Sequence, residues 1–265
     1  GLLDLISTED GIWSVPVNIH RSNVMWYIPQ NLEEWGIEGP PADWDEFLSM
    51  CPTIEDNGVI PLVLGENWTV NHLWESVALA ELGAEGYRGL WTGETSWTSD
   101  EVIAMWDKFG EILQCTNIDV DAATLSWQQA TDKLVNGEAA FNIMGDWAAG
   151  YMVTTLGLGP EEDFAWAPSP GTEGVFMMLS DSFGLPQGAP NREATIAWLR
   201  LLGSQEGQDI FNPLKGSIAA RLDSDLTLYN AYLQSAAADW QQNGVVGSMA
   251  HGAVAPESFS SEFAT

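Results

Sequence analysis

The chain has 265 residues, of which 45% are hydrophobic, so it can bury a substantial core in one large domain or two modest ones. It carries 38 acidic against 8 basic side chains, for a formal net charge of −30. Nucleic acid and anionic membrane surfaces bind clustered Lys and Arg, and are therefore poor candidates for partners. No run of about eighteen apolar residues is present that would span a bilayer. The acidity favours a soluble extracytoplasmic surface or an adaptation to a salty environment.

Apolar patterning, glycines and capping residues divide the chain into alternating strands and helices. Asp43 is expected to cap the helix that follows it, and His20 and Arg21 lie where the chain crosses between two strands. Strands are expected at residues 11–19, 23–28, 59–64, 140–144, 164–168, 175–179 and 182–185. Helices are expected at residues 2–6, 31–35, 44–50, 71–82, 99–115, 125–136, 147–156, 191–202, 205–211, 227–242 and 256–263.

The stretch 138–151 runs from a short apolar strand straight into a helix. Residues 140–144 are expected to be buried. Gly145 leaves the backbone free to turn, and Asp146 stands at the position of a helix N-cap. Trp147 then lies at a helix N-terminus beyond the carboxyl end of the strand, where ligands bind in open α/β sheets. Its indole either stacks on the C–H face of a sugar ring or is a core side chain that closes the corner.

A second unit of strand, loop and helix is expected at residues 59–82. Its loop carries Glu66, Asn67 and Trp68, a polar and aromatic set like the one around Trp147. The unit is therefore built like the one around Trp147.

The two cysteines, Cys51 and Cys115, fall near the ends of two expected helices. A pair with no further Cys and no nearby His makes a poor metal site, so they are either a disulfide or two buried thiols. We expect the disulfide, which fits an oxidising compartment. His20, His72 and His251 are too widely spaced in the sequence to suggest a metal cluster, and neither a metal nor a cofactor is predicted.

Seven motifs follow one another along the whole chain. Three are Gly-Ile-Trp-Ser-Val-Pro (11–16), Pro-Pro-Ala-Asp-Trp-Asp-Glu-Phe (40–47) and Gly-Glu-Ala-Ala-Phe-Asn-Ile-Met-Gly-Asp-Trp (137–147). In this order and spacing they resemble the sugar-binding proteins of ABC importers. The remaining four are similar to the glucose-binding branch of that family: Gly-Glu-Asn-Trp (65–68), Phe-Met-Met-Leu-Ser-Asp-Ser-Phe (176–183), Phe-Asn-Pro-Leu-Lys-Gly-Ser (211–217) and His-Gly-Ala-Val-Ala-Pro-Glu-Ser-Phe (251–259).

The resemblance implies an α/β, periplasmic-binding-protein-like (type II) fold of two lobes joined by crossing strands. It also implies that a domain-sized stretch of the first lobe is missing from the amino end, and that a closing helix after Thr265 is lost. We expect a near-complete C-terminal lobe over residues 20–168 plus 222–265. A remnant of the N-terminal lobe is expected over residues 1–19 plus 169–221.

The resemblance assigns roles to single residues. Trp147 would stack on a pyranose, Asp181 would accept hydrogen bonds from sugar hydroxyls, and Lys215 and His251 would donate or bridge to others. Each of the four also has a structural interpretation, as core aromatic, turn residue, solvated charge and loop donor. Four further residues would line the cleft from the second lobe: Trp127, Glu66, Asn67 and Trp68.

The implied function is binding of a monosaccharide, glucose or galactose, as the extracellular or periplasmic component of an ABC importer. Its partners would be the membrane subunits of that importer. A half-site is expected to bind sugar weakly or not at all, unless two copies complement each other by exchanging elements in a homodimer. The alternatives are a domain-truncated scaffold without sugar binding, a lectin-like module and a glycoside hydrolase. No catalytic motif supports an enzyme.

Overall fold

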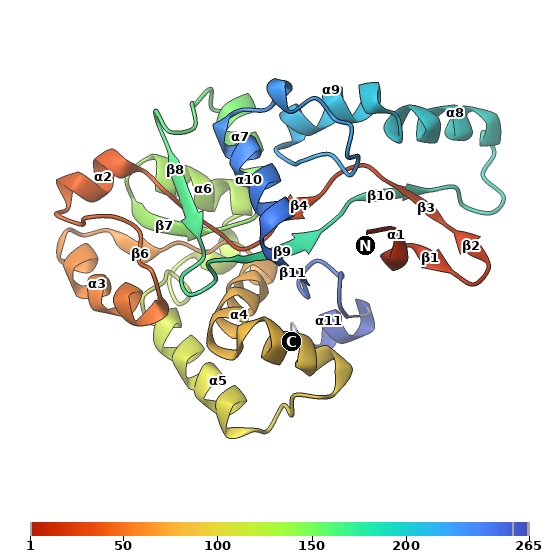
Figure 1. Ribbon diagram of the computed structural model, residues 1–265. Helices are drawn as coiled ribbons and strands as arrows, with labels where there is room; N and C mark the ends of the chain where they lie inside the picture. Colours follow the sequence, from red (N-terminus) through yellow and green to blue (C-terminus); the bar gives the residue numbers. More distant parts are fainter. Residues whose placement is uncertain (1, 256, 264–265) are drawn as a thin grey trace.

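The computed structural model describes residues 2–255 and 257–263, in which helices alternate with short strands (Figure 1). The strands are β1 (Ser7–Thr8), β2 (Gly11–Ile12), β3 (Ser14–Pro16), β4 (His20–Arg21), β5 (Val24–Tyr27), β6 (Ile60–Leu62), β7 (Ala139–Ile143), β8 (Ala165–Pro168), β9 (Val175–Leu179), β10 (Ser182–Gly184) and β11 (Gly244–Gly247). The helices are α1 (Leu2–Leu5), α2 (Pro29–Glu34), α3 (Trp44–Asp56), α4 (Asn67–Thr92), α5 (Asp100–Leu113), α6 (Trp127–Val135), α7 (Trp147–Thr154), α8 (Arg192–Leu202), α9 (Gln205–Lys215), α10 (Ala231–Gln242) and α11 (Glu257–Phe263). Short 3-10 turns lie at η1 (Ala122–Thr124) and η2 (Leu226–Leu228).

A four-stranded sheet in the order β6-β7-β5-β8 forms one centre of the structure. β6 and β7 are parallel, because the chain between them crosses over through α4, α5 and α6. β5 runs antiparallel to both of its neighbours, β7 and β8. Every residue of β7 is buried, so its carboxyl end leads directly from the core into α7.

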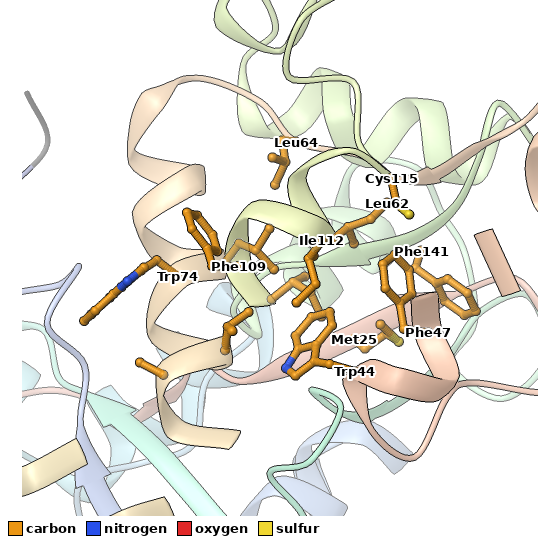
Figure 2. Close-up of a cluster of buried hydrophobic side chains, with 14 of the residues drawn as sticks. Met25, Trp44, Phe47, Leu62, Leu64, Trp74, Phe109, Ile112, Cys115 and Phe141 are labelled. Carbon is orange, nitrogen blue, oxygen red and sulfur yellow. The ribbon is translucent and has the colours of Figure 1, made fainter. Parts of the chain in front are cut away.

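The main core lies where helices α3, α4 and α5 pack against this sheet (Figure 2). α3 begins as expected, because Asp43 accepts a hydrogen bond from Glu46 N, and it continues beyond residue 50 to Asp56. Each large apolar side chain that is fully buried contributes about 1.5–3 kcal/mol to folding. Prominent members of this core are Met25, Trp44, Phe47, Leu62, Trp74, Ile112 and Phe141.

Cys51 of α3 and Cys115, which follows α5, form a disulfide, as the sequence predicted. The bond closes a loop of 64 residues, and it restricts the unfolded chain more than the folded one. We expect the double variant Cys51→Ala, Cys115→Ala to lower the free energy of unfolding by about 3 kcal/mol, measured by urea denaturation. An unchanged denaturation midpoint in the variant would contradict this prediction.

A second, three-stranded sheet has the order β11-β9-β4, and it continues into a long antiparallel ribbon. β4 pairs with β9, and beyond a short break β3 pairs with β10. The ribbon leads from the centre of the molecule to α8 and α9 (Figure 1). His20 and Arg21 therefore lie on the crossing that the sequence indicated.

Two elements, β11 and α4, differ from what the sequence predicted. The segment 244–247 forms β11, parallel to β9, where no strand was predicted. Its pairing partner is about seventy positions away in the sequence, and glycines at both of its ends hide any alternating pattern. In the second unit, α4 starts at Asn67 rather than at residue 71 and continues past a non-helical Gly83 to Thr92.

α8 carries apolar side chains that are mostly uncovered in the described part of the chain. Within α8, whose residues are all described, only Leu202 is buried. Large apolar side chains are exposed on α8, on α9 and on the nearby strands: Ile12, Trp13, Phe183, Trp198, Leu201, Ile210 and Leu214. None of the described helices is long and apolar enough to cross a membrane.

Candidate sugar-binding site

A cavity of about 390 Å³ opens where α7, the start of α4, the ribbon and the end of α9 meet. Its volume falls within the range of small-molecule pockets, about 300–1,000 Å³. The lining residues are His20, Trp68, Trp127, Trp147, Leu179, Asp181, Lys215, Ala250 and His251. The structure thus brings together six of the eight residues that the sequence nominated, from segments that are far apart in the chain.

Trp147 is the first residue of α7 and lies directly after the turn that ends β7. Its ring lies over Gly145, where a Cβ atom would come within 2.2 Å of the indole. Glycine is therefore required at this turn so that the ring can fold back over it. The indole also meets the edges of His20 and His251, with ring centroids 5.5 and 5.0 Å apart.

Asp146 does not cap α7 with its side chain, contrary to the expectation. Its carboxylate instead pairs with His20 Nδ1 and accepts a hydrogen bond of 2.9 Å from the Arg21 backbone N–H. All three residues are buried. Burial is the largest single influence and lowers the pKa of His20, but the charge and hydrogen bond of Asp146, together with the hydrogen bond to Asp181, leave the pKa above its ordinary value. The pair ties the start of α7 to the crossing strand.

Asp181 lies at the break in the ribbon, where Asn18 faces it across the two strands. Asn18 accepts a hydrogen bond of 2.7 Å from the Asp181 backbone N–H and donates one of 2.8 Å to Asp181 Oδ2. His20 Nε2 lies 3.3 Å from the same oxygen. The hydrogen bond from His20, with those of Asn18 and the nearby Lys215 charge, holds the pKa of Asp181 well below its usual range. The other oxygen, Oδ1, makes none of the hydrogen bonds found among the described residues, and Asp181 is part of the pocket wall.

Lys215 ends α9, and its Nζ lies 3.7 Å from Asp181 Oδ2. The following Gly216 adopts a left-handed conformation, φ 83°, and packs against Gly150 of α7. A Cβ at Gly150 would come within 2.5 Å of the Lys215 carbonyl oxygen. The two glycines therefore allow α9 to end against α7, which brings the ammonium group to the pocket.

The histidines that the sequence seemed to scatter converge beside this pocket. One ring nitrogen each of His72 and His251 and one carboxylate oxygen of Glu75 lie within 4.8 Å of one another, which is a ligand set suited to Zn²⁺. Glu75, however, is fully buried and its carboxylate accepts hydrogen bonds from two serine hydroxyls and two backbone N–H groups: Ser22, Ser248, Met249 and Ala250. Burial still raises the pKa of Glu75 to about 7. We interpret Glu75 as a structural acceptor that holds the turn before His251.

The second unit contributes less than the sequence suggested. Trp68 lines the pocket with its ring centroid 6.2 Å from that of Trp147, and Trp127 lines it from the start of α6. Glu66 and Asn67 are not part of the lining. Glu66 is the N-cap of α4 and Asn67 is its first residue, because this helix starts earlier than expected.

Asn18 was not among the predicted site residues, and His20 was expected only to lie at the crossing between two strands. The one signal for His20 was its place between two expected strands, where the chain crosses. Asn18 carried none, because only the pairing of two distant strands places it opposite Asp181.

Comparison with known proteins extends this picture. A family model, bacterial extracellular solute-binding protein, matches residues 1–209. The chain belongs to this family. An uncharacterized ABC transporter extracellular-binding protein of Pyrococcus horikoshii is 32% identical over 252 residues, covering 93% of this chain and 56% of that protein. The xylose/arabinose-binding protein XacG of Haloferax volcanii is 32% identical over 230 residues, covering 84% of this chain and 49% of XacG. The chain thus spans about half the length of these relatives.

A solved structure gives the fold. The bacterial solute receptor AcbH, described as having an exclusive preference for β-D-galactopyranose, superposes with a TM-score of 0.86 at 19% identity. The match covers 99% of this chain and 68% of that receptor. The α/β fold of two-lobe, type II periplasmic sugar-binding proteins, which the sequence predicted, is therefore confirmed.

Proposed function

We propose that this solute-binding protein binds a monosaccharide in the pocket around Trp147. The observation that supports it most is an indole at the cavity wall with an ionised carboxylate and an ammonium group beside it. Asp181 and Lys215 keep 41% and 37% of their side chains exposed, so both can reach a ligand. Sugars are bound by this combination, since an aromatic face takes their C–H groups while charged groups take their hydroxyls.

The proposed roles follow from the geometry. Trp147 stacks on the pyranose, Asp181 accepts from hydroxyls through Oδ1, and Lys215 donates to a hydroxyl oxygen. Trp68 and Trp127 limit the cavity on the side of α4 and α6, and His251 meets a further hydroxyl. Glucose and galactose are the proposed ligands, in keeping with the motifs of the glucose-binding branch and with relatives named for monosaccharides.

The lining of the pocket argues against a glycoside hydrolase. Such an enzyme needs two carboxylates about 5–10 Å apart across the bond that is cut. Among the described residues that line the pocket, one is acidic, Asp181. The neighbouring Asp146 is buried and paired with His20. We therefore propose binding without turnover.

The proposed setting is the periplasm or the outside of the cell, with the membrane subunits of an ABC importer as partners. We also propose the lobe division 20–168 plus 222–265 against 1–19 plus 169–221, with β9 as a connecting strand, because it pairs with β4 and β11 of the first set. The arrangement of the pocket supports it, because the indoles and His251 come from the first set and Asp181 and Lys215 come from the second. The cavity then lies between lobes, as ligand sites at domain interfaces do.

A second proposal concerns assembly. The exposed apolar side chains of α8, α9 and the nearby strands form a surface of the kind that marks protein contacts, and the short strand β10 leaves a free edge beside it. We propose that this face pairs with a second copy of the chain. Light scattering at increasing protein concentration tests the proposal, and a monomer mass throughout would exclude it.

Equilibrium dialysis against labelled D-glucose, D-galactose, D-xylose and maltose tests the proposed function. We expect saturable retention of a hexose, weaker retention of maltose, and no release of reducing sugar from an aryl glycoside. Equal retention of all four sugars by the wild type and by a variant of the pocket would contradict specific binding at this site.

The variant Gly145→Ala probes the position of the indole without removing it. The new methyl group meets the ring at 2.2 Å, so the ring has to shift, and we expect hexose affinity to fall about tenfold. Gly110→Ala in α5 is the matched control, because its Cβ meets nothing within 4 Å. The control should leave affinity unchanged and stabilise the helix by about 0.5–1 kcal/mol. Equal affinity in both variants would place the ligand away from Trp147.

A further inference from the structure

Two imidazole rings link the backbone carbonyl of Ser22 to the wall of the pocket. His72 Nε2 lies 2.9 Å from the Ser22 carbonyl oxygen, and His72 Nδ1 lies 2.9 Å from His251 Nε2. His72 is fully buried, whereas His251 lines the pocket. The protonation of the buried ring therefore bears directly on the ring that a ligand meets.

The carbonyl decides which nitrogen of His72 carries the proton. A carbonyl oxygen can only accept, so His72 Nε2 must be the donor. Burial lowers the pKa of His72 to about 4, so the ring is neutral at pH 7 and its Nδ1 keeps a lone pair. His251 Nε2 faces that lone pair and must donate to it. Burial lowers the pKa of His251 well below its ordinary value, so its Nδ1 also keeps a lone pair.

We propose that His72 is a positioning residue that fixes His251 as a hydrogen-bond acceptor toward the ligand. The inference rests on the proposed sugar-binding function and deepens it. It narrows the expectation that His251 donates or bridges to sugar hydroxyls, because the Ser22 carbonyl, just after β4, determines which tautomer the two rings adopt.

The surroundings of His251 hold its ring in this orientation. Its Nδ1 takes part in none of the hydrogen bonds found within residues 2–255 and 257–263, so this lone pair is left for a ligand. The ring meets Trp147 and Trp68 edge-on, with centroids 5.0 and 5.6 Å away. Its backbone N–H donates to Ser248 Oγ at 3.2 Å, within the turn that Glu75 holds. A flip of the imidazole would break its hydrogen bond with His72, so this contact fixes which ring nitrogen faces His72.

The consequence is a selection rule for the ligand. Among the described side chains that line the pocket, Asp181 Oδ1 and His251 Nδ1 are acceptors without a hydrogen-bond partner, and Lys215 is a donor. A sugar hydroxyl that meets His251 must donate its proton. A fluorine atom or a methyl ether at that position has no proton to donate and leaves the His251 lone pair unsatisfied.

Proton–nitrogen correlation spectra of labelled, ligand-free protein at pH 7 test the tautomers directly. We expect both His72 and His251 to carry their proton on Nε2. The pair His72→Asn and His72→Gln separates this role from a structural one. Asparagine places an amide oxygen near the former Nδ1 and keeps an acceptor for His251, whereas glutamine places its amide near the Ser22 carbonyl and removes that acceptor.

His72→Asn should preserve the His251 tautomer and keep D-glucose affinity within about threefold. His72→Gln should produce a mixture of tautomers at His251 and lower the affinity about tenfold. Among the mono-deoxyfluoro analogues of D-glucose, one should bind the wild type about tenfold more weakly than D-glucose does. In His251→Ala, the same analogue and D-glucose should bind equally well.

A His251 that carries its proton on Nδ1 in the neutral wild type would overturn the proposal, as would identical His251 spectra in the two His72 variants. If the ligand-free spectra show the expected tautomers while no hexose binds, the role of His72 in fixing the His251 tautomer stands and the proposed function fails. The two failures are therefore distinguishable, and thermal unfolding of each variant confirms that it is folded.

Discussion

Replacing Trp147 by alanine is expected to lower hexose affinity about a hundredfold, because the variant removes the aromatic face on which the pyranose stacks. Truncation of a central aromatic anchor typically costs about 2–4 kcal/mol of binding free energy. Trp147→Phe should keep part of the face and lose about tenfold or less. Isothermal titration with D-glucose measures all three proteins on one scale.

The matched control for this prediction is Trp198→Ala. Trp198 lies in α8, is 52% exposed and is not part of the pocket lining. Its removal should leave the dissociation constant unchanged. A loss of affinity in Trp198→Ala equal to that in Trp147→Ala would show that the sugar does not stack on Trp147.

The variant Asp146→Ala should have the largest effect on stability among single substitutions near the site. It leaves the buried His20 ring without its carboxylate and the Arg21 backbone N–H without its acceptor. Removing one partner of a buried pair typically costs about 3–5 kcal/mol. Urea denaturation should therefore show a free energy of unfolding about 4 kcal/mol lower, and hexose binding should weaken because His20 also contacts Asp181.

The same pair gives a pH dependence whose sign is fixed. The folded-state pKa of His20 lies above its unfolded value of 6.5, since the combined effect of Asp146 and Asp181 exceeds that of burial. The stabilisation is therefore fully present below about pH 6.5 and is lost as the pH rises through the folded pKa. In Asp146→Asn this decline should be much smaller, because the uncharged amide no longer favours the imidazolium.

Asp45→Ala is the control for both measurements. Asp45 pairs with Lys108, but its side chain is 82% exposed, and exposed pairs contribute about 0–1 kcal/mol. The control should change stability by less than about 1 kcal/mol and leave the pH profile as in the wild type. A comparable loss in both variants would mean that the Asp146–His20 pair does not stabilise the fold.

Local signals in the sequence were enough for the elements that begin and end with them. Asp43 caps α3, and Gly145 with Trp147 marks the corner between β7 and α7 where it was predicted. Asp146 was placed correctly in the chain, but its carboxylate serves His20 instead of the helix. Two acceptor roles were open to it, and only the approach of the crossing strand decides between them.

The remaining differences come from contacts between distant segments. β11 forms because β9 offers it a parallel partner, and Asn18 reaches Asp181 because the two strands of the ribbon are interrupted at the same place. The histidines seemed unrelated because 179 positions separate His72 from His251. Residue spacing carries no information about such contacts between distant segments. The family motifs indicated Asp181, Lys215 and His251, because each motif contains one residue of the pocket lining.

The most direct test of the central claim is isothermal titration of the chain with D-glucose and D-galactose, on a sample whose mass has been fixed by light scattering. We expect saturable binding of one hexose per pocket, absent or about a hundredfold weaker in Trp147→Ala. No heat up to millimolar concentrations of either sugar, from a folded sample of defined mass, would contradict the claim that the pocket around Trp147 binds a hexose.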